Sequence, residues 1–176
     1  MKQKIAIQGE LGSYSHLAAT EIFDDIEVVP CKTFDQALDL VKNNKDIKAV
    51  IPIENSIAGR VADVHYLLPK YKLSVIGESF HKVNHCLLAL KGNDLKNIKY
   101  VKSHSHAIGQ CHQKINKYNF TPVIEADTAG SAKKLSEEQN KDVAVIASEL
   151  AASIYNLDIV KRNFEDTAGN TTRFLI

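Results

Sequence analysis

The chain has 176 residues, with 22 Lys and Arg against 21 Asp and Glu, and 44% of its residues are hydrophobic. These proportions are those of a folded globular protein and exclude general disorder. The formal net charge of +1 counts against a nucleic-acid partner bound through bulk basicity. Its apolar runs are far shorter than the ~20 residues that span a bilayer, and the first residues do not form a signal peptide. We therefore expect a cytoplasmic protein without a membrane partner.

Three cysteines, Cys31, Cys86 and Cys111, are present, and no CxxC pair occurs. An odd, small number of cysteines without paired spacing predicts reduced thiols rather than a disulfide framework.

Strands and helices alternate along the first part of the chain, and each predicted helix carries apolar residues at helical spacing. The pattern predicts strands at 3–8, 26–30 and 48–53, and helices at 15–23, 33–42 and 59–68.

The pattern changes at residue 73, where two predicted strands, 73–80 and 84–90, follow each other directly. We expect the chain to cross into a second lobe at the short polar link between these two strands, near residues 80–84. Alternation then resumes, with strands at 98–102, 121–125, 142–147 and 172–176, and helices at 104–117, 128–138 and 148–155. Such alternation predicts parallel sheets flanked by helices, in two α/β lobes with a ligand in the cleft between them.

Polar segments follow several predicted strands, as expected of binding loops in an α/β fold. The segment 9–15 contains two glycines and several hydroxyls before a helix, so it either holds an anion on its backbone N–H groups or forms a tight turn capped by Ser13. Glu54, Asn55 and Ser56 follow a buried strand, and either face the cleft or cap the next helix.

The segment 103–112 offers three interpretations. Its histidines and Cys111 suggest a zinc site, but no second ligand pair has zinc spacing. Cys111 with His104 suggests a nucleophile and its base. Cys111 also shares helical phase with Ala107 and Ile115, which favours burial.

Two other polar positions are ambiguous. Asp127 or Thr128 caps the helix at 128–138, while Thr128 and Ser131 could also donate to a substrate oxygen. Arg173 stands in an apolar strand, so its guanidinium needs either a carboxylate ligand or an internal acidic partner.

Together these motifs resemble the prephenate dehydratase family, in order and over the whole chain. The matching segments are Gly12-Ser13-Tyr14-Ser15-His16; Pro52-Ile53-Glu54-Asn55-Ser56 with Gly59; His85 with Leu87-Leu88; Ser103-His104 with Gln110-Cys111; Asp127-Thr128-Ala129; Ala147-Ser148 with Ala151-Ala152 and Tyr155; and Asn170 with Thr172-Arg173-Phe174. The sequence departs from the family pattern at His106, where glutamine is common, and at Glu10-Leu11, where proline is common.

The resemblance implies a catalytic domain over 1–176 with the fold of type-2 periplasmic binding proteins. The first lobe is expected at about 1–80 with 160–176 and the second at about 81–159, with the active site in the cleft and without the usual C-terminal ACT domain. It further implies a homodimer that converts prephenate to phenylpyruvate, water and carbon dioxide in phenylalanine biosynthesis. Aromatisation drives this reaction, so no cofactor and no metal are expected.

The resemblance also implies the site residues. Thr172 is expected to polarise or protonate the leaving hydroxyl, directly or through water, and Arg173 and Glu54 are expected to join it in catalysis. The substrate-binding set is Ser13, Tyr14, Ser15, Asn55, Ser56, Ser103, His104, Gln110, Cys111, Thr128, Ala129 and Phe174.

Two alternatives stay open. Arogenate dehydratase performs the same chemistry on an amino-acid side chain. A non-catalytic binding module of the same fold would need no proton donor at position 172.

Overall fold

The computed structural model describes residues 2–176, and the chain divides into two compact units. Unit 1 comprises Met1–Val83 and Gly169–Ile176, and unit 2 comprises Asn84–Ala168. The return to unit 1 comes later than the expected residue 160, because Phe164 is buried in the core of unit 2. In addition, the backbone N–H of Phe164 donates to the carbonyl of His85. The two α/β units agree with the expected fold class.

Unit 1 contains a parallel and an antiparallel sheet. Its elements are β1 (Gln3–Gln8), α1 (Tyr14–Ile22), β2 (Ile26–Cys31), α2 (Phe34–Asn43), β3 (Ile47–Ala49), β4 (Ile51–Asn55), β5 (Gly59–Arg60), α3 (Ala62–Tyr71), β6 (Glu78–Lys82) and β12 (Thr171–Leu175). The parallel sheet has the order β2-β1-β3, and the antiparallel sheet has the order β5-β4-β12-β6. The antiparallel sheet differs from the expectation of parallel sheets alone.

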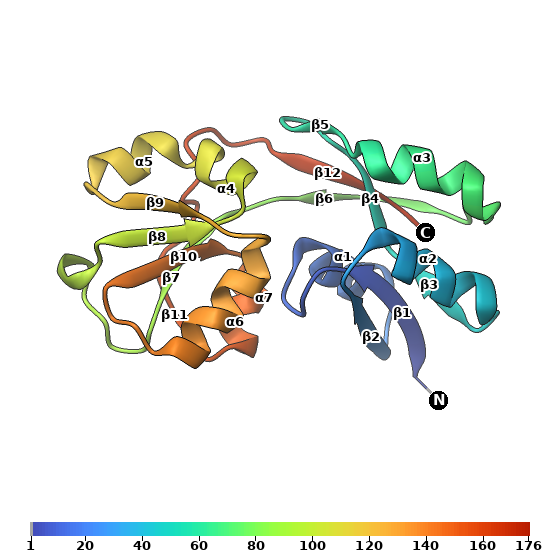
Figure 1. Cartoon of the computed structure of the whole chain (residues 1–176), viewed down its shortest axis with the longest axis horizontal. Helices are drawn as coiled ribbons and strands as arrows, with labels where there is room; N and C mark the ends of the chain where they lie inside the picture. Colours follow the sequence, from blue (N-terminus) through green and yellow to red (C-terminus); the bar gives the residue numbers. More distant parts are fainter. Residues whose placement is uncertain (1) are drawn as a thin grey trace. The chain divides into compact units, whose positions relative to one another are not determined.

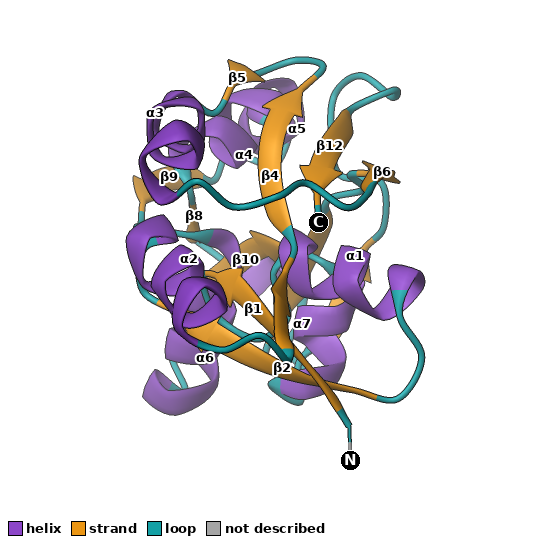
Figure 2. Cartoon of the chain, turned by 90° about the vertical axis from the view of Figure 1, so that its right-hand side faces the viewer, coloured by secondary structure: helices purple, strands orange, loops and turns teal. Residues whose placement is uncertain are grey.

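The core of unit 1 lies on both faces of β1. Ile5 and Ile7 pack with Ala18 and Ala19 of α1, whereas Ala6 packs with residues of α2 and α3. Side chains alternate between the two faces along a strand, so one strand supports helices on both sides. Figure 2 shows α1 on one side of β1 and α2 with α3 on the other.

Unit 2 is built on one mixed sheet of order β11-β7-β10-β8-β9 (Figure 1). Its elements are β7 (Cys86–Ala89), a 3₁₀ turn (Leu95–Asn97), β8 (Tyr100–Ser103), α4 (Ser105–Gln110), α5 (His112–Lys117), β9 (Thr121–Ile124), α6 (Thr128–Glu138), β10 (Val143–Ala147), α7 (Glu149–Ile154) and β11 (Asp158–Lys161).

Strands β7 and β10 are buried along their whole length. Leu87 and Ile146 pack with residues of α4 and α5, while Leu88 and Val145 pack with residues of α6 and α7. Helices on both faces explain why these strands read as continuous apolar runs rather than as alternating ones.

The expected helix at 104–117 is two helices, α4 and α5, with Cys111 between them in a non-helical conformation. The carboxylate of Asp166 explains the break. It accepts hydrogen bonds from the backbone N–H groups of Gln113 and Lys114, at 2.8 and 3.1 Å. These are first-turn donors of α5, which a helix leaves without internal partners.

Two short strands, β5 and β11, were not predicted from the sequence, and the helix expected at 59–68 starts at Ala62. Over residues 2–176 we find no helix with the length and apolar character required to cross a membrane.

We predict opposite effects of alanine at two helical glycines. A Cβ on Gly130 of α6 would lie 2.6 Å from Oδ2 of Asp127, the residue whose Oδ1 accepts from the Gly130 N–H and caps α6. Gly130→Ala should therefore weaken the cap and lower the free energy of unfolding by about 1 kcal/mol. At Gly109 of α4 a Cβ meets nothing within 4 Å. Gly109→Ala should therefore raise the free energy of unfolding by roughly 0.5–1 kcal/mol.

Urea denaturation of both variants tests this pair. Equal effects of the two substitutions would contradict the role assigned to the Asp127 cap.

Candidate functional site

The candidate site of unit 1 forms where β12 runs between β4 and β6. Thr172 of β12 stands opposite Asn55 of β4. The adjacent pair is bonded through its backbone, since the N–H of Ser56 donates to the carbonyl of Thr171 at 2.8 Å. Bonded and non-bonded pairs alternate in an antiparallel ladder, and the non-bonded pairs bring their side chains closer together. Asn55 and Thr172 are such a non-bonded pair.

The side chain of Asn55 uses its full hydrogen-bonding capacity. Its Oδ1 accepts from the backbone N–H groups of Ile57 and Ala58, at 3.0 and 2.8 Å, which fixes the orientation of the amide. Its Nδ2 donates to Oδ1 of Asn170 at 2.6 Å and to Oγ1 of Thr172 at 2.8 Å. Asn55 is therefore a rigid donor aimed at the threonine hydroxyl.

The donated bond decides what Thr172 can do. Because Oγ1 accepts from Asn55, this hydrogen bond does not use the hydroxyl proton of Thr172, which stays free to point to another acceptor. The residue is only 8% exposed, so its O–H sits in a largely dehydrated setting where hydrogen bonds are stronger. This arrangement suits a donor to a bound molecule.

On its other side Thr172 pairs with His81 of β6. Nδ1 of His81 lies 2.7 Å from Oε2 of Glu21 in α1, and its ring lies 6.3 Å from that of Tyr14. Nε2 of His81 is buried and has no hydrogen-bond partner in the described part of the chain. Thr172 thus stands between an amide donor and a buried imidazole on one face of the sheet.

Arg173 and Glu54 are brought together, but on the opposite face of the sheet from Thr172. They are cross-strand partners one step along the ladder, and alternation directs them away from Asn55 and Thr172. The guanidinium of Arg173 lies 2.6 Å from the Glu78 carboxylate and 3.9 Å from that of Glu54. Of the two interpretations of Arg173, the geometry supports an internal acidic partner. Phe174 is buried in the core beside α1.

The first loop behaves as a capped turn. Oγ of Ser13 accepts from the N–H of His16, and Nδ1 of His16 accepts from the N–H of Gly12 at 3.0 Å. These two N–H groups are therefore used within the loop. Ser15 is buried, and Ser56 binds the backbone of Gly169 and Thr171.

In unit 2 the predicted polar residues have structural partners. Ser103 is fully buried, and its hydroxyl donates to the carbonyl of Ile146 at 2.6 Å. Oε1 of Gln110 accepts from Nε2 of His85 at 2.7 Å. The backbone N–H of His85 donates in turn to the buried carboxylate of Glu165. This network ties β7 to α4 and to the loop after β11.

The zinc and nucleophile interpretations of segment 103–112 find no support in the geometry. Nδ1 of His104 accepts from the backbone N–H of His106 and caps α4, while Cys111 is fully buried in the apolar core. Burial, the largest cause, together with the Asp166 and Glu165 carboxylates, raises the pKa of the Cys111 thiol, so it is a poor nucleophile. Residues 2–176 contain no cluster of three potential metal ligands.

Thr128 opens α6 and is partly buried, whereas Ala129 beside it is fully buried in the helix. Asp127, not Thr128, is the cap of α6.

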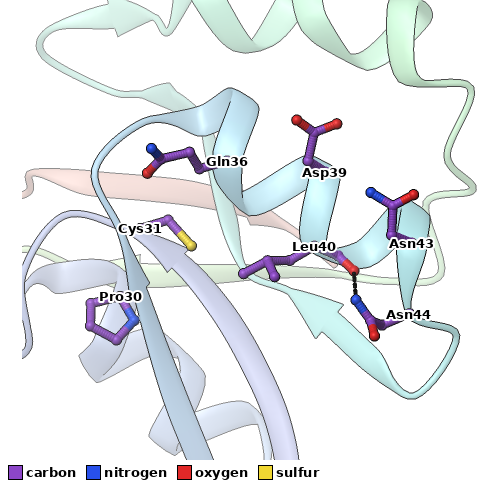
Figure 3. Close-up of a pocket in the computed structure, with 7 residues that line it drawn as sticks. All are labelled: Pro30, Cys31, Gln36, Asp39, Leu40, Asn43 and Asn44. Carbon is purple, nitrogen blue, oxygen red and sulfur yellow. Dashed lines mark hydrogen bonds between the residues drawn. The ribbon is translucent and has the colours of Figure 1, made fainter.

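A groove of about 480 Å³ lies between β2 and α2, outside the predicted site (Figure 3). Its lining contains one carboxylate and several amides but no lysine or arginine: Pro30, Cys31, Gln36, Asp39, Leu40, Asn43 and Asn44. The carboxylate of Asp39, with no cation beside it in the lining, would repel a dicarboxylate. We therefore do not assign the substrate to this groove.

Two members of the unit 1 site, Asn170 and His81, were absent from the predicted site. Asn170 belongs to the matching segment with Thr172, Arg173 and Phe174, so the motif could have predicted its place in the site. His81 read as a link between two strands, and only the register of β6 against β12 shows that it adjoins Thr172.

The prephenate dehydratase family model matches residues 5–176. The bifunctional N-acyl-homoserine lactone acylase/prephenate dehydratase of Komagataeibacter europaeus is 41% identical, over 98% of this chain and 61% of that protein. Arogenate dehydratase/prephenate dehydratase 2 of Arabidopsis thaliana is 39% identical, over 98% of this chain and 45% of that protein. The chain therefore spans about half the length of these curated relatives.

Two solved prephenate dehydratases share the fold. The Arthrobacter aurescens structure with L-Phe has a TM-score of 0.88 and 27% identity, over 98% of this chain and 59% of that one. The Staphylococcus aureus structure has a TM-score of 0.83 and 26% identity, over 99% of this chain and 65% of that one.

We predict that stability falls as the pH drops below 6.5. Burial lowers the pKa of His85 from its ordinary value of 6.5, against the opposing effects of Gln110 and Glu165. Burial lowers those of His16 and His104 as well. The unfolded chain therefore takes up protons first, so the stability present above pH 6.5 is lost as the pH falls through the folded-state pKa.

Unfolding in urea at several pH values between 6.5 and 5 measures this loss. His85→Gln should reduce the slope of stability against pH in that window, and an unchanged slope would show that His85 is not its source.

Proposed function

The chain belongs to the prephenate dehydratase family, and we propose that it catalyses the conversion of prephenate to phenylpyruvate, carbon dioxide and water. The observation that carries this proposal is the Asn55–Thr172 pair, in which a buried hydroxyl accepts from a fixed amide and keeps its own proton for another acceptor.

The reaction requires help at one oxygen. The bond between the ring carbon and its hydroxyl breaks, the bond to the ring carboxylate breaks, and its electron pair completes the aromatic ring. A dianion becomes a monoanion, carbon dioxide and water, so one proton is taken up. In the proposal, the Thr172 O–H donates to the departing hydroxyl, whose developing negative charge strengthens that hydrogen bond.

A threonine hydroxyl is a weak acid, so Thr172 is assigned to polarise the leaving oxygen or to relay a proton rather than to lose one outright. Asn55 supports either role, because its donated hydrogen bond stabilises negative charge on Oγ1. The carboxylate that leaves as carbon dioxide needs an environment that solvates it weakly. The segment at 13–15 and Arg173 remain the predicted ligands of the other carboxylate, although the ion pairs of Arg173 count against it.

The unit 2 residues of the predicted binding set also remain proposals. Thr128 is the side chain best suited to a direct contact. Ser103, Gln110 and His104 are held by internal hydrogen bonds, and we assign them to shaping unit 2.

Arogenate is the second candidate substrate, because the Arabidopsis relative is named for both activities. The two substrates share the ring and the leaving groups, so the role of Thr172 is the same for each. The Komagataeibacter relative is also named for an acylase, which makes N-acyl-homoserine lactone a useful third substrate to assay.

A cytoplasmic location and a homodimer complete the proposal. The location is supported by the three free cysteines, because disulfides are rare in cytoplasmic proteins. The homodimer follows from the family resemblance.

Thr172→Ala should lower kcat for prephenate by about 10²–10⁴-fold, the range a positioned proton donor contributes. Thr171→Ala is the matched control, because Thr171 is the preceding residue of β12 and alternation points it to the opposite face. Phenylpyruvate formation near neutral pH is measured against a control without enzyme, since prephenate also breaks down spontaneously in acid.

Loss of activity in both threonine variants would show that disturbing β12 abolishes activity, and would not support a specific role of the Thr172 hydroxyl. Activity that survives Thr172→Ala would move the donor elsewhere. A folded parent without turnover of prephenate or arogenate would favour the binding-module alternative.

Asn55→Asp should lower kcat by roughly 10²-fold with a smaller change in KM. The aspartate keeps the acceptor for the N–H groups of Ile57 and Ala58, so the local turn survives. It replaces the amide donor by a carboxylate, to which Thr172 must then donate its own proton. Asn55→Asp with kcat unchanged and an unchanged thermal melt would show that the direction of this hydrogen bond does not matter.

A further inference from the structure

A buried histidine adjoins the candidate donor Thr172 in unit 1. His81 of β6 is 5% exposed, and its Nδ1 lies 2.7 Å from Oε2 of Glu21 in α1. Its other ring nitrogen, Nε2, is also buried and has no hydrogen-bond partner within residues 2–176. Buried polar atoms without partners are rare and costly in folded proteins. The unbonded Nε2 therefore points to a role that involves a bound molecule or a mobile proton.

Strand register places His81 and Thr172 on the same face of the antiparallel sheet. They are direct partners across β6 and β12, which lie next to each other (Figure 2). The N–H of Val83 donates to the carbonyl of Asn170, and bonded pairs recur at every second residue, so His81 and Thr172 are also a bonded pair. Cβ atoms of such partners lie about 5.5 Å apart, a separation that one water molecule between the two side chains can bridge.

The Glu21 carboxylate determines which nitrogen of the imidazole exchanges a proton. An ionised carboxylate only accepts hydrogen bonds, so Nδ1 of His81 is the donor in this contact. Nε2 is then the nitrogen that gains and loses a proton. In catalytic triads a carboxylate likewise orients an imidazole, whose second nitrogen exchanges a proton with a neighbouring hydroxyl. Glu21, His81 and Thr172 have the residue types and the order that such a relay needs.

Two elements pack against the face of β6 that carries His81. Helix α1 presents the Glu21 carboxylate and the phenol of Tyr14, whose ring centroid lies 6.3 Å from that of His81. Strand β12 presents the uncharged Thr172. The charged side chains of the two strands alternate to the opposite face of the sheet: Glu78, Lys82 and Arg173. Glu21 is therefore the charged group that acts most directly on the imidazole.

We propose that His81, held by Glu21, supplies the proton that Thr172 passes to the departing hydroxyl, an inference that rests on the proposed conversion of prephenate. The imidazolium donates through Nε2–H to Oγ1 of Thr172, directly or through one water molecule. As the bond between the ring carbon and the hydroxyl breaks, Thr172 gives its proton to the leaving oxygen and receives one from Nε2. Water leaves, Thr172 is unchanged, and His81 is neutral until it takes a proton from solvent.

This relay supplies what a threonine hydroxyl alone lacks. The reaction consumes one proton, and an imidazolium gives up a proton far more readily than a threonine does. Oγ1 of Thr172 has two lone pairs, so it can accept from Asn55 and from His81 at once while it donates to the substrate. Because His81 acts through Thr172, it is a positioning residue and need not touch the substrate.

His81→Gln tests the proton supply, because glutamine keeps a polar side chain and cannot become a cation. The substitution should lower kcat for prephenate by about 10²-fold with a smaller change in KM. In the parent chain kcat should fall as the pH rises and the imidazolium is lost, and His81→Gln should flatten this dependence.

His65→Gln is the matched control for that substitution. Nε2 of His65 is also buried without a partner in the described chain. However, His65 lies in α3, which packs on the face of the sheet opposite Thr172. Its replacement should leave kcat and the pH profile unchanged. Equal effects of the two histidine substitutions would overturn the proposal.

Glu21→Gln tests the part played by the carboxylate. A neutral amide stabilises an imidazolium less than a carboxylate does, so the fall in kcat should move to lower pH. Glu27→Gln removes an exposed carboxylate of β2 that pairs with Lys4 and should leave the profile in place. A profile that Glu21→Gln does not shift would contradict the assigned pair.

A double substitution tests whether His81 acts through Thr172. In the Thr172→Ala background, His81→Gln should change kcat by less than about twofold, because the relay has already lost its last member. Two effects that multiply in full would show that His81 supports activity by another route and would overturn the proposal.

NMR of ¹⁵N-labelled imidazole rings tests the pair without substrate, with His81→Gln identifying the signals of His81. Nδ1 should stay protonated, while Nε2 should gain a proton as the pH falls through the range of the assays. A His81 ring that keeps the same protons throughout that range would overturn the relay. A parent chain that turns over neither prephenate nor arogenate defeats the proposed function itself, whereas an active parent whose pH profile survives His81→Gln defeats the relay alone.

Discussion

The alternation of side chains along β12 is the constraint on which the candidate site depends. One face of this strand receives Thr172 and Phe174, the first beside Asn55 and the second in the apolar core. The other face receives Arg173, which is held between acidic residues of β4 and β6. A single step along the strand thus separates the buried hydroxyl of Thr172 from the Arg173 cation, which pairs with acidic residues of the sheet. Shifting the register by one residue would exchange the two roles.

Polar side chains in unit 2 serve a different purpose. Glu165 and Asp166, in the loop after β11, accept hydrogen bonds from backbone donors of His85 and α5. These interactions fix the strand–helix packing of a sheet that is covered on both faces. Burial in this network lowers the pKa of His85. The free energy of unfolding of unit 2 therefore falls as the pH drops through a mildly acidic range.

Much of this organisation could be predicted from the sequence. The α/β alternation and the crossing near residue 83 follow from local pattern. Motif resemblance singled out the Asn55 and Thr172 segments, whose side chains are hydrogen-bonded in the structure. The remainder depends on contacts between distant residues. The break at Cys111 is set by Asp166, and the neighbour of Thr172 on β6 is set by strand register. Periodicity within one segment carries no information about either. The sequence also did not determine the face of β12 on which Arg173 lies, because one face of this strand holds buried residues and the other holds charged pairs.

The discontinuity of unit 1 has a consequence for how the chain acquires its structure. The antiparallel sheet is complete only when β12 enters between β4 and β6, after all of Asn84–Ala168 has been synthesised. Unit 2 is continuous and can fold as soon as it leaves the ribosome, whereas β4 and β6 must wait for a strand more than a hundred residues after β4. Until then β6 has two unpaired edges and His81 faces no threonine. The contact between Asn55 and Thr172 is therefore a late event in biosynthesis, and the nascent chain is most exposed to strand-mediated aggregation just before that contact forms.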